Sequence, residues 1–547
     1  MYRSSERSRK NLTRFRGIWL TLTVKFKAII TRSQSLDRSP SGRAKTLHTL
    51  FFCLFLLPLL SNAASTVTTQ SGPDTESNAI ESTLGVMAGV TNYDKPFNEY
   101  TWVTAHNAYL DNMQSQLDRG VRAFMLDLYR IYKPPLLTYV GMCHGSGGAD
   151  HYCPHEGTTR FADAMNNTFI PFLKSHPNEV VTLILEAYVD KEAFVNELKA
   201  IPGIENMIFQ PSAFSQKDRW PTLREIIASG RRIIITSAGY LNGAYTVNGS
   251  TFQVLNDADI QIQNTYDLGA NALDHNWVCE TRWKPGVVPA EPEKPCTGPD
   301  EPKGCPIPAK PEKPYPGVPL KRSQATGSMA GKERLFVMNQ IHSWMKSEAD
   351  AGNIDNNLTY LERRVERYCR ATAGERLVPN FIAIDYSNVG DAIPYAAALN
   401  NGGYYFYEDN NANTDQDTVC VLPAGQDYNI KLASHGCEND EARSLVLRGI
   451  ASGSRLTVYD SPEGNRQDDY SIIDVKRDIG LNERIVVNSF ERTQNTDDYS
   501  VRHFNNNGLD GKISRIHIEE HPVEFSEAAI VLHEGNNGSQ NIVCSVG

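Results

Sequence analysis

The chain has 547 residues, which is enough for two or three domains with full hydrophobic cores. Its formal net charge of −10 argues against general nucleic-acid binding, because proteins of that class usually present a basic face. We therefore expect a globular protein whose partners do not include nucleic acid.

Residues 1–64 have the parts of a secretory signal rather than of a folded domain. A strongly basic stretch over residues 1–47 precedes the apolar run Leu50–Leu60, which ends in small residues. The alternative is a membrane anchor, but a spanning helix needs about 20 apolar residues, and this run is shorter and contains Pro58. We expect a secreted, extracellular chain whose Ser/Thr-rich N-terminus is flexible over residues 65–92.

The number and spacing of the cysteines are consistent with a secreted protein. None of them has zinc-site spacing, so disulfides are expected rather than a metal. Short loops suggest three pairs, Cys143 with Cys153, Cys296 with Cys305, and Cys420 with Cys437. Ten cysteines less Cys53 in the leader leave an odd number, so one thiol is free or pairs between chains. If the chain is a secreted glycoprotein, four sequons are usable, at Asn166, Asn248, Asn357 and Asn537.

Residues 93–400 alternate between continuous apolar runs and helical patterns. Strands are predicted at 100–105, 121–128, 137–143, 180–186, 207–209, 232–237, 334–339 and 380–385. Helices are predicted at 161–175, 191–200, 221–229 and 354–371. This alternation is typical of an α/β protein whose parallel sheet is covered on both faces. With about seven such strands, we expect an irregular TIM-type (β/α) barrel rather than an open sheet.

One segment interrupts the barrel pattern. Residues 284–322 are crowded with Pro, Lys and Glu and cannot contribute to a core. This Pro-rich insertion could bind a partner, but a tolerated surface excursion of extended character, tied by Cys296 and Cys305, is the favoured interpretation.

The pattern changes after the barrel. Over residues 404–547, short strands separated by Gly, Asn and Asp turns predict a small all-β sandwich. Residues 458–471 and 487–500 both end in Asp-Asp-Tyr-Ser, a repeat that fits two Greek keys. The domain resembles the βγ-crystallin type, in which turns like Asn439-Asp440 can hold calcium, but ordinary turn chemistry is the favoured explanation of these turns.

Polar side chains stand at the ends of the predicted barrel strands, namely His106, Asn107, Asp127, His144, Glu186 and Asp385. The carboxyl ends of barrel strands share one mouth, where function resides. Two histidines can divide the roles of general base and general acid, and an aspartate can hold one of them in the right tautomer. Asparagine, aspartate and glutamate oxygens suit Ca²⁺ or Mg²⁺.

Taken singly, each of these residues could be a satisfied strand end or a helix cap. Together they predict cleavage of a phosphodiester by an adjacent hydroxyl or by water.

Several motifs resemble the catalytic X region of phosphatidylinositol-specific phospholipases C, and in particular secreted fungal and plant PLC-like phosphodiesterases. They are residues 104–107 (TAHN), 116–127 (QLDRGVRAFMLD), 143–144 (CH), 176–183 (HPNEVVTL), 220–223 (WPTL) and 379–385 (PNFIAID). The resemblance covers roughly residues 93–400 and is specific because both order and spacing hold. It implies a distorted TIM barrel and cleavage of a phosphodiester, such as that of an inositol lipid.

The resemblance also assigns roles. His106 is similar to the base that deprotonates the attacking hydroxyl, His144 to the acid that protonates the leaving alkoxide, and Asp385 to the carboxylate partner of the base. Asn107, Asp127 and Glu186 match the calcium ligands of the metal-dependent members, and Arg122 is interpreted as structural.

The chain departs from the metal-dependent pattern at Met125, where those members have a glutamate. A thioether is a poor ligand for a hard cation. The implied Ca²⁺ cofactor therefore lacks one carboxylate.

The leading hypothesis is a secreted phosphoric diester hydrolase that acts on a phosphodiester or phospholipid, with peripheral contact to a membrane or cell surface. The alternative is a catalytically weak or inactive binding protein whose barrel and β-domain attach it to a surface or glycan. The intact histidines favour the enzyme, and Met125 favours the binding protein. A toxin-like barrel that cleaves sphingomyelin also uses two histidines and a cation, but no further sequence feature indicates it.

Overall fold

The structure is a computed structural model of the whole chain. The residues it describes are 89–133, 137–144, 153, 158–239, 241–266, 275–283, 286–288, 313–315, 319–341, 347–369, 376–423, 427–432, 436–504, 507–520, 530–533 and 542–546. The predicted leader, the Cys296–Cys305 pair and the sequon at Asn537 lie outside these residues.

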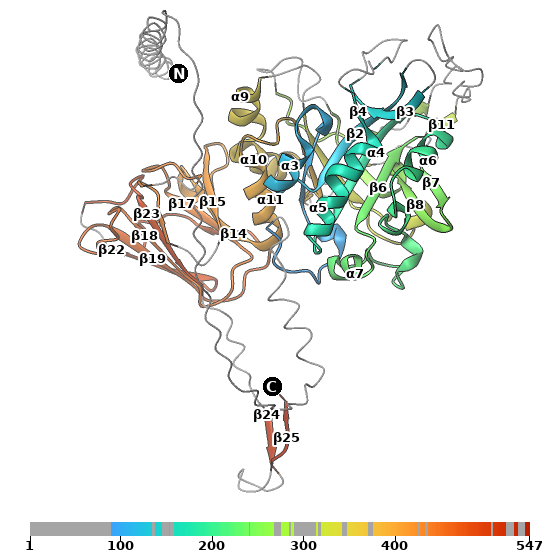
Figure 1. Cartoon of the computed structure of the whole chain (residues 1–547). Coiled ribbons are helices and arrows are strands. Elements are labelled where there is room, and N and C mark those ends of the chain that lie inside the picture. Colours follow the sequence, from blue (N-terminus) through green and yellow to red (C-terminus); the bar gives the residue numbers. More distant parts are fainter. Residues whose placement is uncertain are drawn as a thin grey trace, which may run out of the picture. The chain divides into compact units, whose positions relative to one another are not determined.

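A large sheet dominated by parallel pairs forms the first part of the fold (Figure 1). Its parallel strands are β1 (Trp102–Ala105), β2 (Ala123–Lys133), β5 (Val181–Tyr188), β6 (Ile233–Ala238), β8 (Ser250–Asn256), β9 (Gln261–Gln263), β12 (Leu335–Gln340) and β13 (Phe381–Ile384). They are ordered β8-β6-β5-β2-β1-β13-β12-β9, so strands that follow one another along the chain are paired except β8 and β9, and the first strand, β1, also pairs with the last, β13. The predicted α/β class is confirmed.

The ring of strands is not completely hydrogen-bonded. Within the described residues no ladder joins β8 to β9, and the four residues of α8 (Asp257–Ile260) stand between them. Both strands run in the common parallel direction, so together they act as one interrupted strand. The sheet is thus rolled and irregular, and its hydrogen bonding does not close as it does in an ideal TIM barrel.

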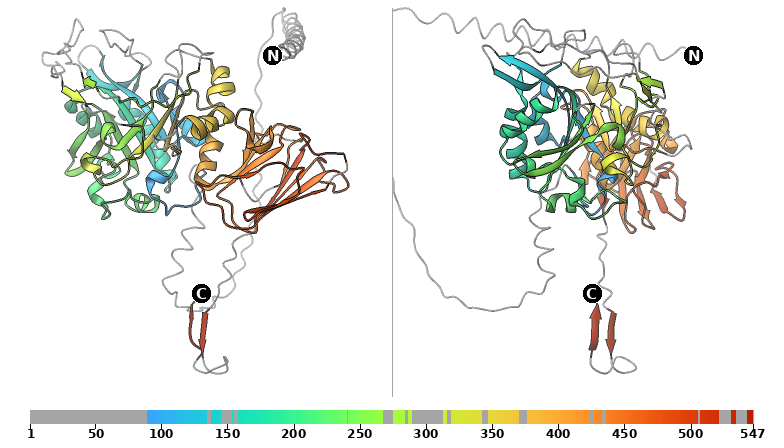
Figure 2. Two further views of the ribbon diagram at one scale, coloured as in Figure 1. Left: turned by 180° about the vertical axis from the view of Figure 1, so that it is seen from behind. Right: turned by 90° about the vertical axis from the view of Figure 1, so that its right-hand side faces the viewer.

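Helices cover the outer face of this sheet (Figures 1 and 2). They are α3 (Met113–Arg119), α4 (Phe161–Ala164), α5 (Ile170–Ser175), α6 (Lys191–Lys199), α7 (Leu223–Ala228), α9 (Glu348–Asp350), α10 (Leu358–Arg363) and α11 (Ala392–Asn401). Their starts follow local chemistry. Thr222 and Glu225 form a capping box on α7, and Asp190 caps α6 by accepting a hydrogen bond from the Ala193 amide.

Alternation along the strands separates an outer core from an inner one. On β2, Phe124 and Leu126 belong to the cluster that includes most of the helices, whereas Ala123 and Met125 belong to a second cluster to which most of the parallel strands contribute. The inner cluster takes residues from both ends of the strand path, such as Leu255 and Leu335, so the sheet is rolled around it. Successive side chains of a strand face opposite ways, so Asp127 faces inward with Met125.

Two predictions about the barrel strands are corrected. β3 (Leu137–Met142) is not a barrel strand, because it pairs antiparallel with β2 and also with β4 (Thr159–Arg160). Only three residues separate β2 from β3, and a parallel partner needs a crossover of about a dozen residues or more. The short strand predicted at 207–209 is a single bridge from Ile208 to Ile233, and the fifth strand position is filled by β8 and β9 instead.

The C-terminal part is an all-β sandwich, as predicted. One sheet has the order β15-β14-β17-β20 and the other β16-β23-β18-β19-β22-β21. The bounds are β14 Gly403–Tyr407, β15 Thr418–Leu422, β16 Asp427–Asn429, β17 Ser444–Arg448, β18 Arg455–Tyr459, β19 Tyr470–Val475, β20 Ile485–Val487, β21 Gln494–Asn495, β22 Tyr499–Phe504 and β23 Arg515–Glu519. Residues from both sheets pack in one core. The βγ-crystallin resemblance stays a prediction.

Three short antiparallel pairs complete the described strands. β7 (Gly243–Val247) forms a hairpin with β8, β10 (Gly286–Val288) pairs with β11 (Lys313–Tyr315) inside the Pro-rich insertion, and β24 (Ile530–His533) pairs with β25 (Ile542–Val546).

The two parts of the fold share a buried ionic network. The sheet that contains β14 is buried on both faces, because its other face packs against α10 and α11. Glu366, on the turn that continues α10, accepts from Arg448 Nη2 at 2.8 Å and pairs with Arg376 Nε at 3.0 Å. Glu366 and Arg448 are 8% and 2% exposed. Both parts belong to one compact unit, Glu76–Gly547.

We expect Arg448→Ala to lower the free energy of unfolding by about 3–5 kcal/mol, because it leaves Glu366 buried with only one of its two arginines. Urea denaturation measures the loss. Arg455→Ala is the matched control, since Arg455 in the neighbouring sheet pairs with Asp474 at 2.6 Å but is 44% exposed. Its loss should be about 0–1 kcal/mol. Equal losses in the two variants would contradict the prediction.

Disulfides bind Cys143 to Cys153, Cys420 to Cys437, and Cys279 to Cys369. The first two confirm short-loop predictions. The third joins residues 90 apart and was not predicted, because sequence spacing gives no sign of so long a loop.

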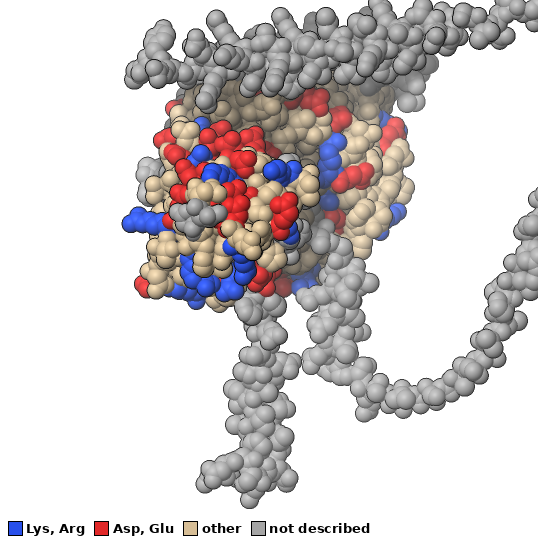
Figure 3. All heavy atoms as spheres, turned by 90° about the vertical axis from the view of Figure 1, so that its left-hand side faces the viewer, with Lys and Arg blue, Asp and Glu red and all other residues tan. Residues whose placement is uncertain are grey.

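Two further observations concern the surface. Figure 3 looks onto the side of the β-domain, where acidic and basic side chains are interspersed among the described residues rather than gathered in one basic face. Within the described part of the chain, no helix has both the length and the apolar character that a membrane span requires.

Candidate active site

His106 and Asp385 meet at the carboxyl ends of two adjacent parallel strands. The β1–β13 register pairs Ala105 with Ile384, and the His106 amide donates to the Ile384 carbonyl at 2.9 Å. Beyond this point His106 Nδ1 lies 2.6 Å from Asp385 Oδ1. The two side chains are 25% and 21% exposed, so the pair is half-buried but reachable from solvent. This bond leaves Nε2 as the ring nitrogen that can take a proton.

Asp127 and Glu186 are side by side for the same geometric reason. The parallel register of β2 and β5 pairs Asp127 with Glu186, and two residues further on it pairs Tyr129 with Tyr188. Residues two apart share a face of a strand, so the carboxylates form one inward row and the tyrosines the next. The tyrosine rings stack with centroids 4.5 Å apart.

Tyrosine hydroxyls engage these carboxylates. Tyr109 Oη lies 2.9 Å from Asn107 Oδ1 and 2.9 Å from Asp127 Oδ2. Tyr188 donates to Glu186 Oε1. Burial, followed by the charge of Asp127, raises the pKa of Tyr109, so its hydroxyl stays protonated and can donate.

The pKa of Asp127 is raised to about 6. Burial is the main cause, and the negative charge of Glu186 adds to it. The hydrogen bond from Tyr109 and the charges of His106 and His144 act in the opposite direction. Both histidines are therefore within electrostatic reach of one carboxylate.

His144 reaches the mouth by a different route from the one predicted. It follows β3, which descends from the tip of the β2–β3 hairpin, and the Cys143 amide donates to the Asp127 carbonyl at 3.3 Å. The bond between Cys143 and Cys153 ties this end of the strand to the segment before β4. His144 is exposed.

The structure thus brings together all six of the residues predicted for the mouth, while Arg122 lies elsewhere. Its guanidinium donates to Glu179 from Nε at 2.7 Å and from Nη2 at 2.8 Å. Arg122 immediately precedes β2, at the end of the strand opposite the mouth, which agrees with the structural role predicted for it.

The residues at the mouth do not fit the calcium ion that the resemblance implies. Ca²⁺ takes 6–8 oxygen ligands, whereas the three predicted ligands already accept hydrogen bonds from Tyr109 and Tyr188. The inward residues one row below Asp127 and Glu186 are Met125 and Ile184, which offer no oxygen.

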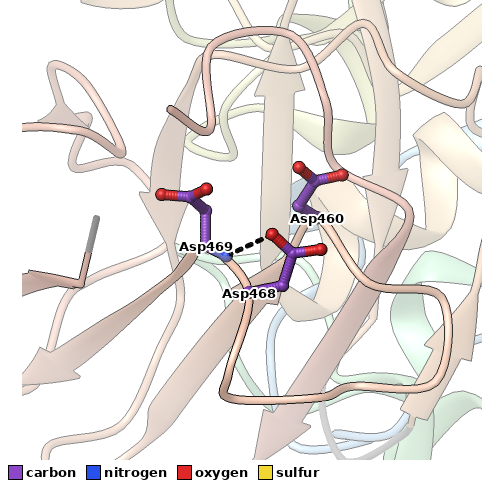
Figure 4. Close-up of side chains that lie close together, drawn as sticks. All are labelled: Asp460, Asp468 and Asp469. Carbon is purple, nitrogen blue, oxygen red and sulfur yellow. Dashed lines mark hydrogen bonds between the residues drawn. The ribbon is translucent and has the colours of Figure 1, made fainter. Parts of the chain in front are cut away.

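Among the described residues, one group of three acidic, histidine or cysteine side chains is close enough to share an ion, and it lies in the β-domain (Figure 4). It consists of Asp460, Asp468 and Asp469, and the Asp469 amide donates to Asp468 Oδ1 at 3.0 Å. Lys512 supplies a positive charge close enough to lower the pKa of Asp460, although burial and the neighbouring aspartates raise it overall. This turn cluster is separate from the mouth.

Sequence reasoning missed Asn356, which holds the backbone around Asp385. Its Nδ2 donates to the carbonyls of Asp385 at 2.8 Å, Tyr386 at 3.2 Å and Val389 at 3.3 Å. Tyr386 has a φ of 52°, a left-handed conformation that is rare for an aromatic residue and persists only where the surroundings impose it. No sequence signal marks Asn356, because it falls inside a segment predicted as one continuous helix.

Arg282 was also missed. Its guanidinium donates to Gln263 Oε1 at 3.0 Å and stands 3.8 Å from the centroid of the Tyr266 ring. Burial lowers its pKa, and the charges of Asp257 and Glu186 oppose that shift. The charge of Arg282 is therefore close enough to Glu186 for the two to interact. A single arginine after a short polar strand gives no sequence signal.

Comparisons with known proteins agree on one domain. The family model described as PI-PLC X 1 matches residues 90–268. A PI-PLC X domain-containing protein of Arabidopsis thaliana is 28% identical over 162 residues, which are 26% of this chain and 36% of that protein. PI-PLC X domain-containing protein 1 of Arthroderma benhamiae is 30% identical over 154 residues, which are 26% of this chain and 47% of that protein. The chain thus spans less than half the length of either relative.

Solved structures show a weaker likeness. The phosphatidylinositol-specific phospholipase C of Listeria monocytogenes has 13% identity and a TM-score of 0.25, covering 34% of this chain and 68% of its own. That of Staphylococcus aureus has 11% identity and a TM-score of 0.30, covering 57% of this chain and 97% of its own. Residues 90–268 of this chain are thus similar to the PI-PLC X domain, which the matching family model describes and which the names of both relatives contain.

Proposed function

We propose that this chain is a phosphoric diester hydrolase of the phospholipase C type, with His106 and His144 as its acid–base pair. The observation that carries the proposal is the 2.6 Å bond between His106 Nδ1 and Asp385 Oδ1 at the rim of the rolled sheet. The X-domain match and the electrostatic proximity of His144 to Asp127 support it.

In the proposed reaction a hydroxyl group attacks phosphorus, and the phosphorus–oxygen bond to the leaving alcohol breaks. His106 Nε2 takes the proton of the attacking hydroxyl, and Asp385 stabilises the imidazolium that forms. His144 gives a proton to the departing alkoxide, so no free alkoxide is released at neutral pH. The next turnover requires the two histidines to exchange protonation states through solvent, which reaches both of them.

A phospholipid or another phosphodiester is the proposed substrate, cleaved outside the cell. Three disulfides among the described residues support an oxidising compartment. The X-domain family supports a phosphodiester substrate at a coarse level.

The test is an assay of the purified full-length chain on phosphatidylinositol vesicles and on water-soluble glycerophosphodiesters. Release of a phosphorylated head group or of its cyclic phosphate from phosphatidylinositol supports the proposal. If none of these substrates is turned over while the protein still sediments with the vesicles, the chain is a binding protein instead, as the replacement at Met125 would favour.

We expect Asn356→Asp to lower kcat by about 10- to 100-fold with little change in KM, because misplacing a catalytic group by about 1 Å is enough for such a loss. The substitution keeps the shape of the side chain but replaces the amide donor by an acceptor that faces three carbonyl oxygens. Initial-rate kinetics on whichever substrate the assay shows to be cleaved measure the effect.

Asn357→Ala is the matched control. Asn357 caps α10 by accepting a hydrogen bond from the Thr359 amide at 2.9 Å, and among the described residues it makes no hydrogen bond to the Asp385 turn. Loss of this cap should cost about 1 kcal/mol of stability and leave kcat within twofold. A normal kcat in Asn356→Asp would show that the turn keeps its place without this amide.

A further inference from the structure

The hydroxyl of Tyr109 stands where two of the expected metal ligands converge. It lies 2.9 Å from both Asn107 Oδ1 and Asp127 Oδ2, so one proton is shared between two acceptors. Asn107 has a φ of 48°, a left-handed conformation that asparagine tolerates better than most residues. The backbone after His106 therefore turns so that the asparagine amide and Tyr109 come together beside Asp127.

A cation that bridged Asn107 Oδ1 and Asp127 Oδ2 would need this same position. Calcium–oxygen distances are about 2.3–2.6 Å, so an ion shared by Asn107 and Asp127 would have to displace a hydroxyl that stands 2.9 Å from each. The third expected ligand, Glu186, accepts from Tyr188 in the same way.

The residues next to Asp127 and Glu186 offer a cation no further ligand that could replace the hydrogen bonds from the two tyrosines. One row below, Met125 is 8% exposed and packs in the apolar inner core with Ile184. A thioether and an alkyl group give a hard cation no ligand. The positive charge of Arg282 interacts with Glu186.

We propose that Tyr109 takes the place of a divalent cation between Asn107 and Asp127, and that this mouth works without a bound metal. The inference rests on the proposed phosphodiesterase activity only for its catalytic half, because metal binding can be measured by itself. The tyrosine holds the two oxygens in the position that a shared ion would otherwise fix.

Calorimetric titration with CaCl₂ tests the binding half. The Asp460→Asn/Asp468→Asn variant is the starting protein, because it removes the acidic cluster of the β-domain as a competing site. We expect no saturable binding of Ca²⁺ at millimolar concentrations. Saturable binding that disappears on adding Asp127→Asn would overturn the proposal.

Paired substitutions test the assignment of Tyr109. In the same background, Tyr109→Phe combined with Met125→Glu removes the hydroxyl and supplies a carboxylate, and we expect Ca²⁺ affinity to rise at least tenfold. Tyr132→Phe with Met125→Glu is the control, since Tyr132 lies further along β2 beyond the carboxylate row. Equal affinities in the two double variants would overturn the role given to Tyr109.

Chelation tests the catalytic half. We expect EDTA to change the rate of the wild-type chain by less than twofold. A loss of tenfold or more that Ca²⁺ restores would overturn the proposal. If the wild-type chain turns over no substrate, the proposed function fails, yet the titrations above still decide whether the mouth holds a metal.

Discussion

Replacing His106 or His144 by alanine is expected to lower kcat by about 10³- to 10⁴-fold, with the fold intact. Each substitution removes one of the two proton transfers that the proposed reaction needs. Because both transfers serve one turnover, the double variant should be scarcely slower than either single variant. Initial rates together with circular dichroism and melting curves measure activity and folding in the same samples.

His517→Ala is the control for these variants. His517 lies on β23 of the sandwich, pairs with Glu519 at 3.2 Å and is 38% exposed. It should keep the wild-type rate. A His106 variant with wild-type turnover would remove the basis of the proposed mechanism, whereas a His144 variant with wild-type turnover would leave the base in place and call for a different acid.

The residues of the mouth were predictable from two features of parallel sheets. Apolar runs such as residues 180–186 mark strands buried on both faces, and a polar side chain at the end of such a run stands out. The carboxyl ends of parallel strands then meet at one edge. For this reason His106, Asp127, Glu186 and Asp385 could be placed together without a structure.

The direction of a strand could not be read in this way. The run that ends before His144 is as apolar as its neighbours, yet it is the returning strand of a hairpin. The residues between β2 and β3 are too few for a crossover, and this short spacing was the signal that the hydrophobic pattern concealed. The error left His144 at the mouth because a strand that descends toward the rim ends there as well.

The hydrogen bonds that neighbouring side chains make to the site residues could not be predicted from the sequence either. Tyr188 is two residues after Glu186 and Tyr129 two after Asp127, so period-two reasoning could have put all four on the inner face. Tyr109 and Asn356 had no such signal, because each acts from an irregular segment whose path depends on tertiary packing. β9 was missed because the buried glutamines Gln261 and Gln263 break its apolar run.

Asp385→Asn is expected to lower kcat by up to about 10⁴-fold while KM stays nearly constant. The carboxylate accepts the Nδ1 proton of His106 at 2.6 Å, which keeps Nε2 free of a proton and ready to act as a base. An asparagine amide can turn and donate to Nδ1 instead, so that the proton moves to Nε2 and the base is lost. The geometry of the pair survives, but the tautomer is wrong.

The kinetic signature separates this effect from a folding defect. A partly unfolded enzyme would lose rate in proportion to its folded fraction, whereas a wrong tautomer lowers the rate of a fully folded one. Asp474→Asn is the matched control, because Asp474 on β19 also forms a 2.6 Å charged hydrogen bond, in this case with Arg455, at a site remote from the mouth. It should leave kcat unchanged. If Asp385→Asn likewise kept the wild-type rate with a normal melting curve, the short bond to His106 would be structural, and the base would have to be oriented by the turn that Asn356 holds.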